Sequence, residues 1–101
     1  MSDEKIIVNV DIDLEDLIPG FLHNRSKELE SLHDALERQD FQSIQFVGHS
    51  LKGVGGGYGF DGMSDLGAKI ENSAKAQELA ELKDIIKQYE NYLERIEVVF
   101  E

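Results

Sequence analysis

The stretch DFQSIQFVGHSLKGVGGGYG, residues 40–59, decides the fold of this 101-residue chain. Aspartate is one of the residue types favoured at the N-terminal cap of a helix, and Asp40 opens this stretch. The apolar residues that follow Asp40 recur every three or four positions, so they share one face of a helix. These apolar positions are Phe41, Ile44, Val47, Leu51, Val54 and Tyr58. The pattern predicts an amphipathic helix that runs into a glycine cluster and stops by Gly59.

Three further segments have the same helical periodicity. The first ends near residues 38–39, the second opens at Asp61 as its cap, and the third runs from Leu79 to Ile96 with nearly heptad spacing. We expect the turn between the last two at residues 75–77. Four amphipathic helices with short connections predict an all-α fold, an antiparallel up-down four-helix bundle.

Residues 6–14 alternate between apolar and polar side chains, which is the period of a strand. No partner strand is evident elsewhere in the sequence. We therefore predict an extended N-terminal arm over residues 1–13, laid on a helical bundle that spans about residues 14–101. The arm and the bundle form a single domain, with Asp13 or Asp16 as the cap of the first helix.

Composition excludes several classes of function. Acidic residues outnumber basic ones 21 to 10, for a formal net charge of −11, and such a surface repels nucleic acid. The chain has no cysteine, and no apolar run approaches the roughly 20 residues of a membrane span. Its start lacks the basic and apolar regions of a signal peptide. We expect a monomeric cytoplasmic domain that binds neither membrane nor nucleic acid.

Seven of the nine glycines lie between residues 48 and 62. Inside a helix each costs roughly 0.5–1 kcal/mol relative to alanine, so the segment is either a loop or a helix whose surface must be bare. On a helix, His49, Lys52, Gly53 and Gly56 line one outward stripe. An accessible imidazole beside an ammonium group favours an anionic reactant, and neutral imidazole is a nucleophile. The stripe therefore indicates phosphoryl transfer through a phosphohistidine.

Other interpretations of these residues are weaker. Residues 57–62 match G-x-G-x-x-G, but a helical segment precedes them and the sequence offers no parallel sheet around them. Lys52 precedes the glycines instead of following them, which excludes a Walker A loop. Close helix packing explains Gly48 and Gly55 but not the outward glycines. The histidines form no H-x₃-H pair, so we expect no metal site.

The pentapeptide HSLKG at residues 49–53, followed by Gly59, resembles the signature of histidine-containing phosphotransfer (HPt) domains. That signature reads H-x-[LI]-K-G, with another glycine ten positions after the histidine. The resemblance covers nearly the whole chain and includes the Leu-Ile-Pro-x-Phe-Leu segment at residues 17–22. It implies a four-helix bundle that carries a phosphoryl group.

The resemblance implies a role for each matching residue. His49 accepts the phosphoryl group on Nε2, and Lys52 stabilises the phosphate. Gly53 keeps the approach open, and Gly59 serves the turn out of the helix. Glu71, 22 residues after the histidine, falls where the family often has Gln or Glu, whose side chain hydrogen-bonds and orients the imidazole.

The implied function is that of a phosphohistidine carrier in a two-component multistep phosphorelay. Its partners are response-regulator receiver domains and a sensor or hybrid histidine kinase, and Mg²⁺ is expected on the receiver, with no cofactor bound by this chain. The sequence has no ATP-binding or kinase motif, so the chain is a transfer intermediate and not a complete enzyme. The alternatives are a bundle of this type that only binds a partner, and a structural module, which leaves the glycine stripe unexplained.

Overall fold

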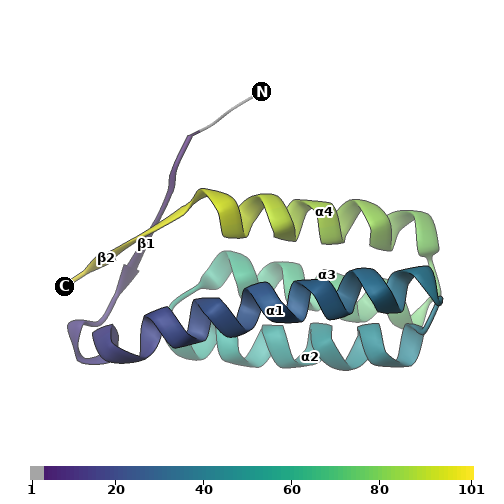
Figure 1. The fold of residues 1–101 in the computed structure, drawn as a ribbon, viewed down its shortest axis with the longest axis horizontal. Helices are drawn as coiled ribbons and strands as arrows, with labels where there is room; N and C mark the ends of the chain where they lie inside the picture. The colour runs from purple at the N-terminus through teal and green to yellow at the C-terminus, as the bar shows by residue number, and fades with distance from the viewer. Residues whose placement is uncertain (1–3) are drawn as a thin grey trace.

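The computed structural model describes residues 4–101, within which four α-helices account for most of the chain. They are α1 (Ile18–Glu37), α2 (Phe41–Tyr58), α3 (Asp61–Lys75) and α4 (Leu79–Arg95). Figure 1 shows the helices side by side along the long axis, with the chain turning back at each connection. The predicted all-α class with four helices is confirmed. No helix in this part of the chain is long and apolar enough to cross a membrane.

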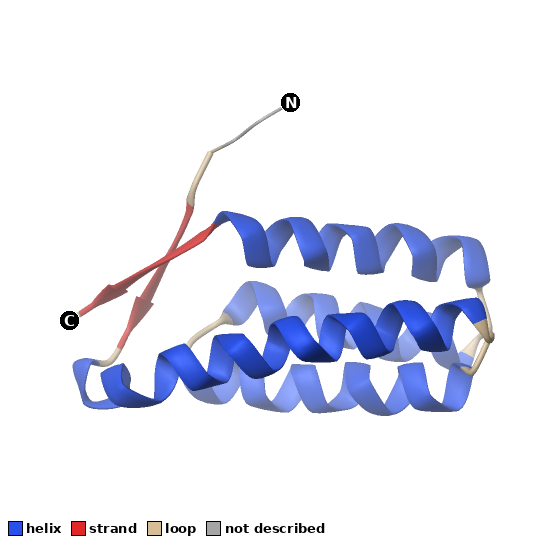
Figure 2. Cartoon of the chain, in the orientation of Figure 1, coloured by secondary structure: helices blue, strands red, loops and turns tan. Residues whose placement is uncertain are grey.

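The prediction of an unpartnered N-terminal arm is wrong. Strand β1 (Ile6–Val10) pairs in parallel with strand β2 (Ile96–Phe100), which continues directly from α4. Figure 2 shows this two-stranded ribbon in red at one end of the bundle. Val8 and Val10 of β1 are buried in the core. The first three residues of the expected arm lie outside the described residues.

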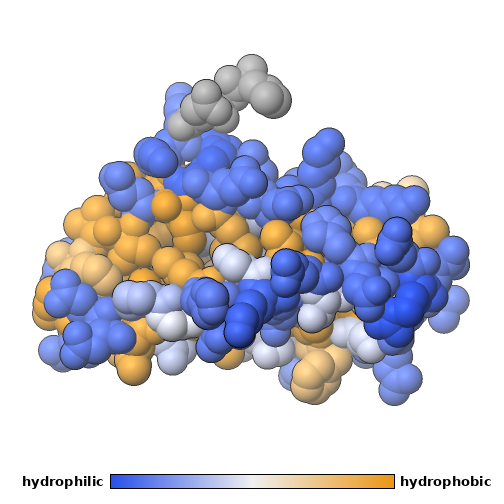
Figure 3. All heavy atoms as spheres, viewed as in Figure 1, coloured by the Kyte–Doolittle hydropathy of each residue, from blue (hydrophilic) through white to orange (hydrophobic). Residues whose placement is uncertain are grey.

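The start of the first helix also differs from the prediction. A 3-10 helix, η1 (Ile12–Leu17), precedes α1, and the Asp11 carboxylate caps it by accepting the N–H of Asp13 at 2.9 Å. Neither Asp13 nor Asp16 caps α1. Several large apolar side chains near this end stay exposed, and Figure 3 shows hydrophobic residues gathered there. They are Ile7, Ile12, Leu17 and Val99.

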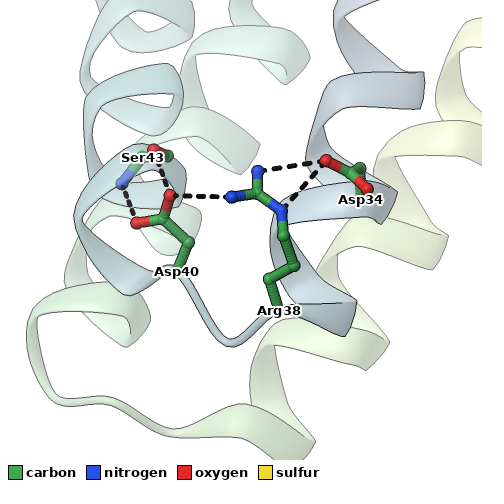
Figure 4. A network of polar contacts seen from close by, with 4 residues as sticks. All are labelled: Asp34, Arg38, Asp40 and Ser43. Atoms are coloured by element: carbon green, nitrogen blue, oxygen red, sulfur yellow. Dashed lines mark hydrogen bonds and ion pairs between the residues drawn. The ribbon is translucent and has the colours of Figure 1, made fainter.

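Asp40 caps α2 as predicted. Its carboxylate accepts hydrogen bonds from the Ser43 N–H at 3.2 Å and from the Ser43 hydroxyl at 2.7 Å. The Arg38 guanidinium bridges Asp40 and Asp34 across the connection (Figure 4). The predicted cap of α3 is wrong by one residue, because Asp61 is the first helical residue and Phe60 stands at the cap without a side-chain hydrogen bond.

The core fills the space between the helices with aliphatic and aromatic side chains. The largest fully buried ones are Leu32, Ile44, Leu51, Phe60, Met63, Ile70, Leu82, Ile86 and Tyr89. At the end of α2, the rings of Tyr58 and Phe21 stack with their centroids 4.4 Å apart. This contact fixes the last turn of a helix that has little side-chain surface of its own.

Helices α2 and α3 approach so closely that their backbones touch. A Cβ atom on Gly48 would lie 2.6 Å from the Glu71 nitrogen, and one on Gly67 would lie 2.6 Å from the Lys52 nitrogen. The Ser64 hydroxyl donates a hydrogen bond of 2.8 Å to the Lys52 carbonyl. Glycine is therefore required at these crossing points by space, because a side chain would force the helices apart.

We expect Gly67→Ala to lower the free energy of unfolding by about 1–3 kcal/mol, because the added methyl group has no room against the α2 backbone. Gly53→Ala is the matched control, since a Cβ there has no neighbour within 4 Å. This control should keep or raise stability by up to about 1 kcal/mol through helix propensity. Urea unfolding measures both values, and equal stabilities would contradict the close approach.

Candidate functional site

His49 lies in the middle of α2, with its side chain 66% exposed. It follows Gly48, which faces α3, so the tight helix crossing sets the position of the imidazole. Lys52 lies one turn further along α2, with its side chain 47% exposed. The two side chains predicted to act together therefore stand on the same accessible side of the helix.

The side chain of Glu71 contacts both of these residues from the neighbouring helix. It lies on α3, one turn after Gly67, and only 10% of its side chain is exposed. Its Oε2 lies 2.9 Å from His49 Nδ1, and its Oε1 lies 3.0 Å from Lys52 Nζ. One nearly buried carboxylate thus contacts both the imidazole and the ammonium group.

The ammonium of Lys52 lowers the pKa of Glu71 below its ordinary value of 4.5, mainly through their hydrogen bond. Desolvation by burial acts in the opposite direction, and the hydrogen bond to His49 lowers the pKa further. An ionised carboxylate only accepts hydrogen bonds, so the proton of the neutral imidazole lies on Nδ1. This tautomer leaves the lone pair of Nε2 free.

The glycines beyond the histidine leave the surface of α2 bare. A Cβ on Gly53 would have no neighbour within 4 Å, and one on Gly56 would contact only the Ser64 hydroxyl oxygen at 3.8 Å. The helix continues through these residues to Tyr58. Gly59 then ends it with φ +89°, a left-handed conformation that glycine adopts without a steric penalty.

The other histidines do not join this site. The Nε2 of His33 lies 3.5 Å from Glu90 Oε1, on α1 and α4. In the described part of the chain, no three His, Cys, Asp or Glu side chains are grouped to hold a metal ion. The site is therefore a single imidazole with a carboxylate and an ammonium group.

Two residues of this region were not identified from the sequence as part of the site. Gly67 stands four positions before Glu71 on the same helical face, and a glycine inside a predicted helix was the signal for a close contact. Phe46 lies one turn before His49 and is 72% exposed. The signal for Phe46 was its position outside the apolar row of the α2 sequence.

Comparison with protein families gives one match, to the family described as Hpt domain, over residues 16–98. Searches of curated proteins and of solved structures gave no significant match. The matched region contains all four helices, together with His49, Lys52 and Glu71.

Glu71→Gln tests the electrostatic arrangement through the pH dependence of stability. Because the folded-state pKa of Glu71 lies below its ordinary value, its ionised form stabilises the fold above about pH 4.5. That contribution is lost as the pH falls through the lowered folded-state pKa. We expect the wild type to melt higher than the variant near neutral pH, with the gap closing in acid. A gap that stays constant down to about pH 3 would contradict the ion pair.

Proposed function

The chain belongs to the Hpt domain family, and from this premise we propose that it carries a phosphoryl group on His49 between partners of a two-component phosphorelay. One observation supports this most strongly. The imidazole is exposed, and its Nδ1 lies 2.9 Å from a nearly buried carboxylate. This arrangement presents Nε2 as a nucleophile in a fixed orientation.

The transfer begins with an aspartyl phosphate on a receiver domain. The Nε2 lone pair attacks phosphorus, the N–P bond forms as the P–O bond breaks, and the receiver aspartate leaves as a carboxylate. The imidazole keeps its proton on Nδ1 and becomes cationic. Glu71 faces that charge and stabilises the phosphorylated ring, as an orienting acid does in a catalytic triad. Transfer to a second receiver reverses these steps.

The neighbouring residues assist by charge and by space. Lys52 lies one turn from the ring, where its ammonium group attracts the anionic phosphoryl group. Gly53 and Gly56 leave room for the incoming domain, and Gly59 ends the helix. The receiver supplies Mg²⁺, which neutralises the transferring group. Together these features make the chain a platform for the nucleophile, with the metal and the phosphorylated aspartate supplied by its partner.

The proposed partners are receiver domains of response regulators and a sensor or hybrid histidine kinase. We place the carrier in the cytoplasm as a monomer, since a carrier must leave one partner before it reaches the next. No ATP-driven step is assigned to this chain. Its activity is the exchange of a phosphoryl group between the partners.

His49→Gln should abolish phosphoryl acceptance and leave the melting temperature nearly unchanged, because an exposed side chain contributes little packing. The measurement is incubation with a phosphorylated receiver, followed by detection of acid-labile, alkali-stable label. His33→Gln is the matched control, because it removes another exposed histidine and should keep the label. Label that persists in His49→Gln would assign the acceptor to another residue.

Gly53→Leu should slow phosphorylation by a receiver without unfolding the protein. The added side chain projects into open space beside the imidazole, and helix propensity favours it by roughly 0.5–1 kcal/mol. The ratio of receiver-driven to phosphoramidate-driven labelling measures the obstruction, because phosphoramidate is small. An unchanged ratio would show that the bare surface does not serve access, and a strong loss of stability would place Gly53 in a packed environment.

A further inference from the structure

The ribbon of β1 and β2 leaves the outer edge of β2 without a pairing strand. The Glu101 N–H donates to the Val10 carbonyl at 3.1 Å, and the Glu101 carbonyl accepts the Ile12 N–H at 2.9 Å. Both backbone groups of Glu101 therefore point toward β1. Because successive residues of a strand point these groups to alternate sides, those of Val98 and Phe100 point away from β1. In the part of the chain that the structure describes, the sheet has only these two strands.

The outer edge of β1 is not open in the same way. It faces the connection between α2 and α3, where the Asn9 carbonyl oxygen lies 3.4 Å from the position of a Cβ on Gly59. A further strand therefore has room beside β2 and not beside β1. An unpaired strand edge presents a row of N–H and C=O groups that can pair with another chain.

The side chains of β2 give its edge one apolar face and one acidic face. One set of side chains is half-buried and packs against the core: Ile96, Val98 and Phe100. The other set is exposed: Glu97, Val99 and Glu101. Each carboxylate is two residues from Val99, which is 42% exposed. A strand added to this edge would meet apolar side chains on one face and two carboxylates on the other.

The same end of the molecule lacks basic side chains. Residues 6–24 and 96–101 contain no lysine or arginine, and they hold six of the 21 carboxylates of the chain. These are Asp11, Asp13, Glu15, Asp16, Glu97 and Glu101. Lys5 and Arg95 precede the two strands, so they stand at the start of the ribbon and not at its acidic end. A second copy of this chain would be repelled here, whereas a cationic segment would be attracted.

We propose that the outer edge of β2 binds an extended segment of another protein as a third strand, in which apolar residues alternate with lysine or arginine. Its backbone pairs with Val98 and Phe100, and its apolar side chains extend the half-buried face of the ribbon. Its basic side chains lie beside Glu97 and Glu101. Main-chain hydrogen bonds supply the affinity of such strand addition, and the side chains supply the specificity.

This binding surface is separate from the phosphoryl acceptor. Gly59, which lies beside β1, follows His49 by ten residues, or about 15 Å along the axis of α2. Figure 2 shows the ribbon at one end of the bundle, beyond the helix that carries the imidazole. A partner held by a strand at the ribbon would stay at a high local concentration near His49.

The first experiment uses the capped peptide GKVTVKG, whose lysines are spaced to face Glu97 and Glu101 while its valines face Val98 and Phe100. The peptide is titrated into the isotope-labelled protein and followed by the NMR shifts of backbone amides. We expect saturable shifts at the amides of Val98 and Phe100. The control peptide GEVTVEG has the same apolar face and should cause no shift there at the same concentration.

The second experiment removes the carboxylates of the edge. Glu97→Gln combined with Glu101→Gln should weaken the binding of GKVTVKG about three- to tenfold at low salt, because two exposed ion pairs are lost. The matched control combines Glu30→Gln with Glu37→Gln, two exposed residues of α1. It changes the net charge equally and should keep the wild-type affinity.

The third experiment tests the backbone hydrogen bonds with two N-methylated forms of GKVTVKG. One form is methylated on its valines and the other on its threonine and lysines, so each blocks one edge of the peptide strand. Strand addition uses a single edge of the peptide. We therefore expect one form to lose at least about tenfold in affinity and the other to bind as the parent peptide does.

Three results would overturn the strand-binding edge. The first is the absence of shifts at Val98 and Phe100, or equal shifts with GEVTVEG. The second is an equal loss in both double variants, which would reveal only long-range attraction. The third is parent affinity in both methylated forms. A shift of the same amides with protein concentration alone would assign the edge to a second copy and overturn the proposed occupant. None of these measurements uses phosphoryl transfer, so the carrier function and the strand site are tested separately.

Discussion

The backbone contact between α2 and α3 at Gly48 and Gly67 is the constraint on which the site depends. Cβ positions on these two glycines fall 2.6 Å from backbone nitrogens of the facing helix, so no other residue fits without separating the helices. Glu71 follows Gly67 by one turn, and the same contact places it beneath His49. The 2.9 Å hydrogen bond between these side chains is thus a consequence of helix packing. Bulkier residues at these two positions would separate α2 from α3 and leave a glutamate at position 71 further from the ring.

Burying a carboxylate normally destabilises its ionised form, and here the opposite shift prevails because two donors meet one acid. Lys52 holds Oε1 and His49 holds Oε2, and together they outweigh the desolvation of Glu71 and keep its pKa low. The arrangement also leaves the ammonium group half exposed instead of burying it. The same lysine can therefore neutralise the acid at rest and face an anionic group that approaches the imidazole.

Much of the site could be predicted from sequence because its determinants are local. The stripe of His49, Lys52, Gly53 and Gly56 follows from helical spacing, and the Asp40 cap follows from the preference for Asp at helix N-termini. The parallel ribbon could not be predicted this way. Ile96 continues the apolar spacing of α4 while its backbone already turns extended, and its partner Ile6 lies at the other end of the chain. Pairing between two strands that lie so far apart in the sequence has no local signature. The burial of Glu71 likewise depends on tertiary contacts, which the local sequence does not show.

Glycine serves two opposite purposes along α2, and the environment of the missing Cβ separates them. Gly48 and Gly55 face α3, where a side chain has no room, whereas Gly53 and Gly57 face open space, where a side chain meets nothing within 4 Å. The inward pair is explained by packing, while the outward glycines weaken the helix without any packing benefit. The helix stays intact because Asp40 caps its start, Tyr58 stacks on Phe21 and Gly59 closes its end. Packing therefore does not explain the outward glycines, and this is why we propose that the bare surface beside the imidazole serves the approach of a partner.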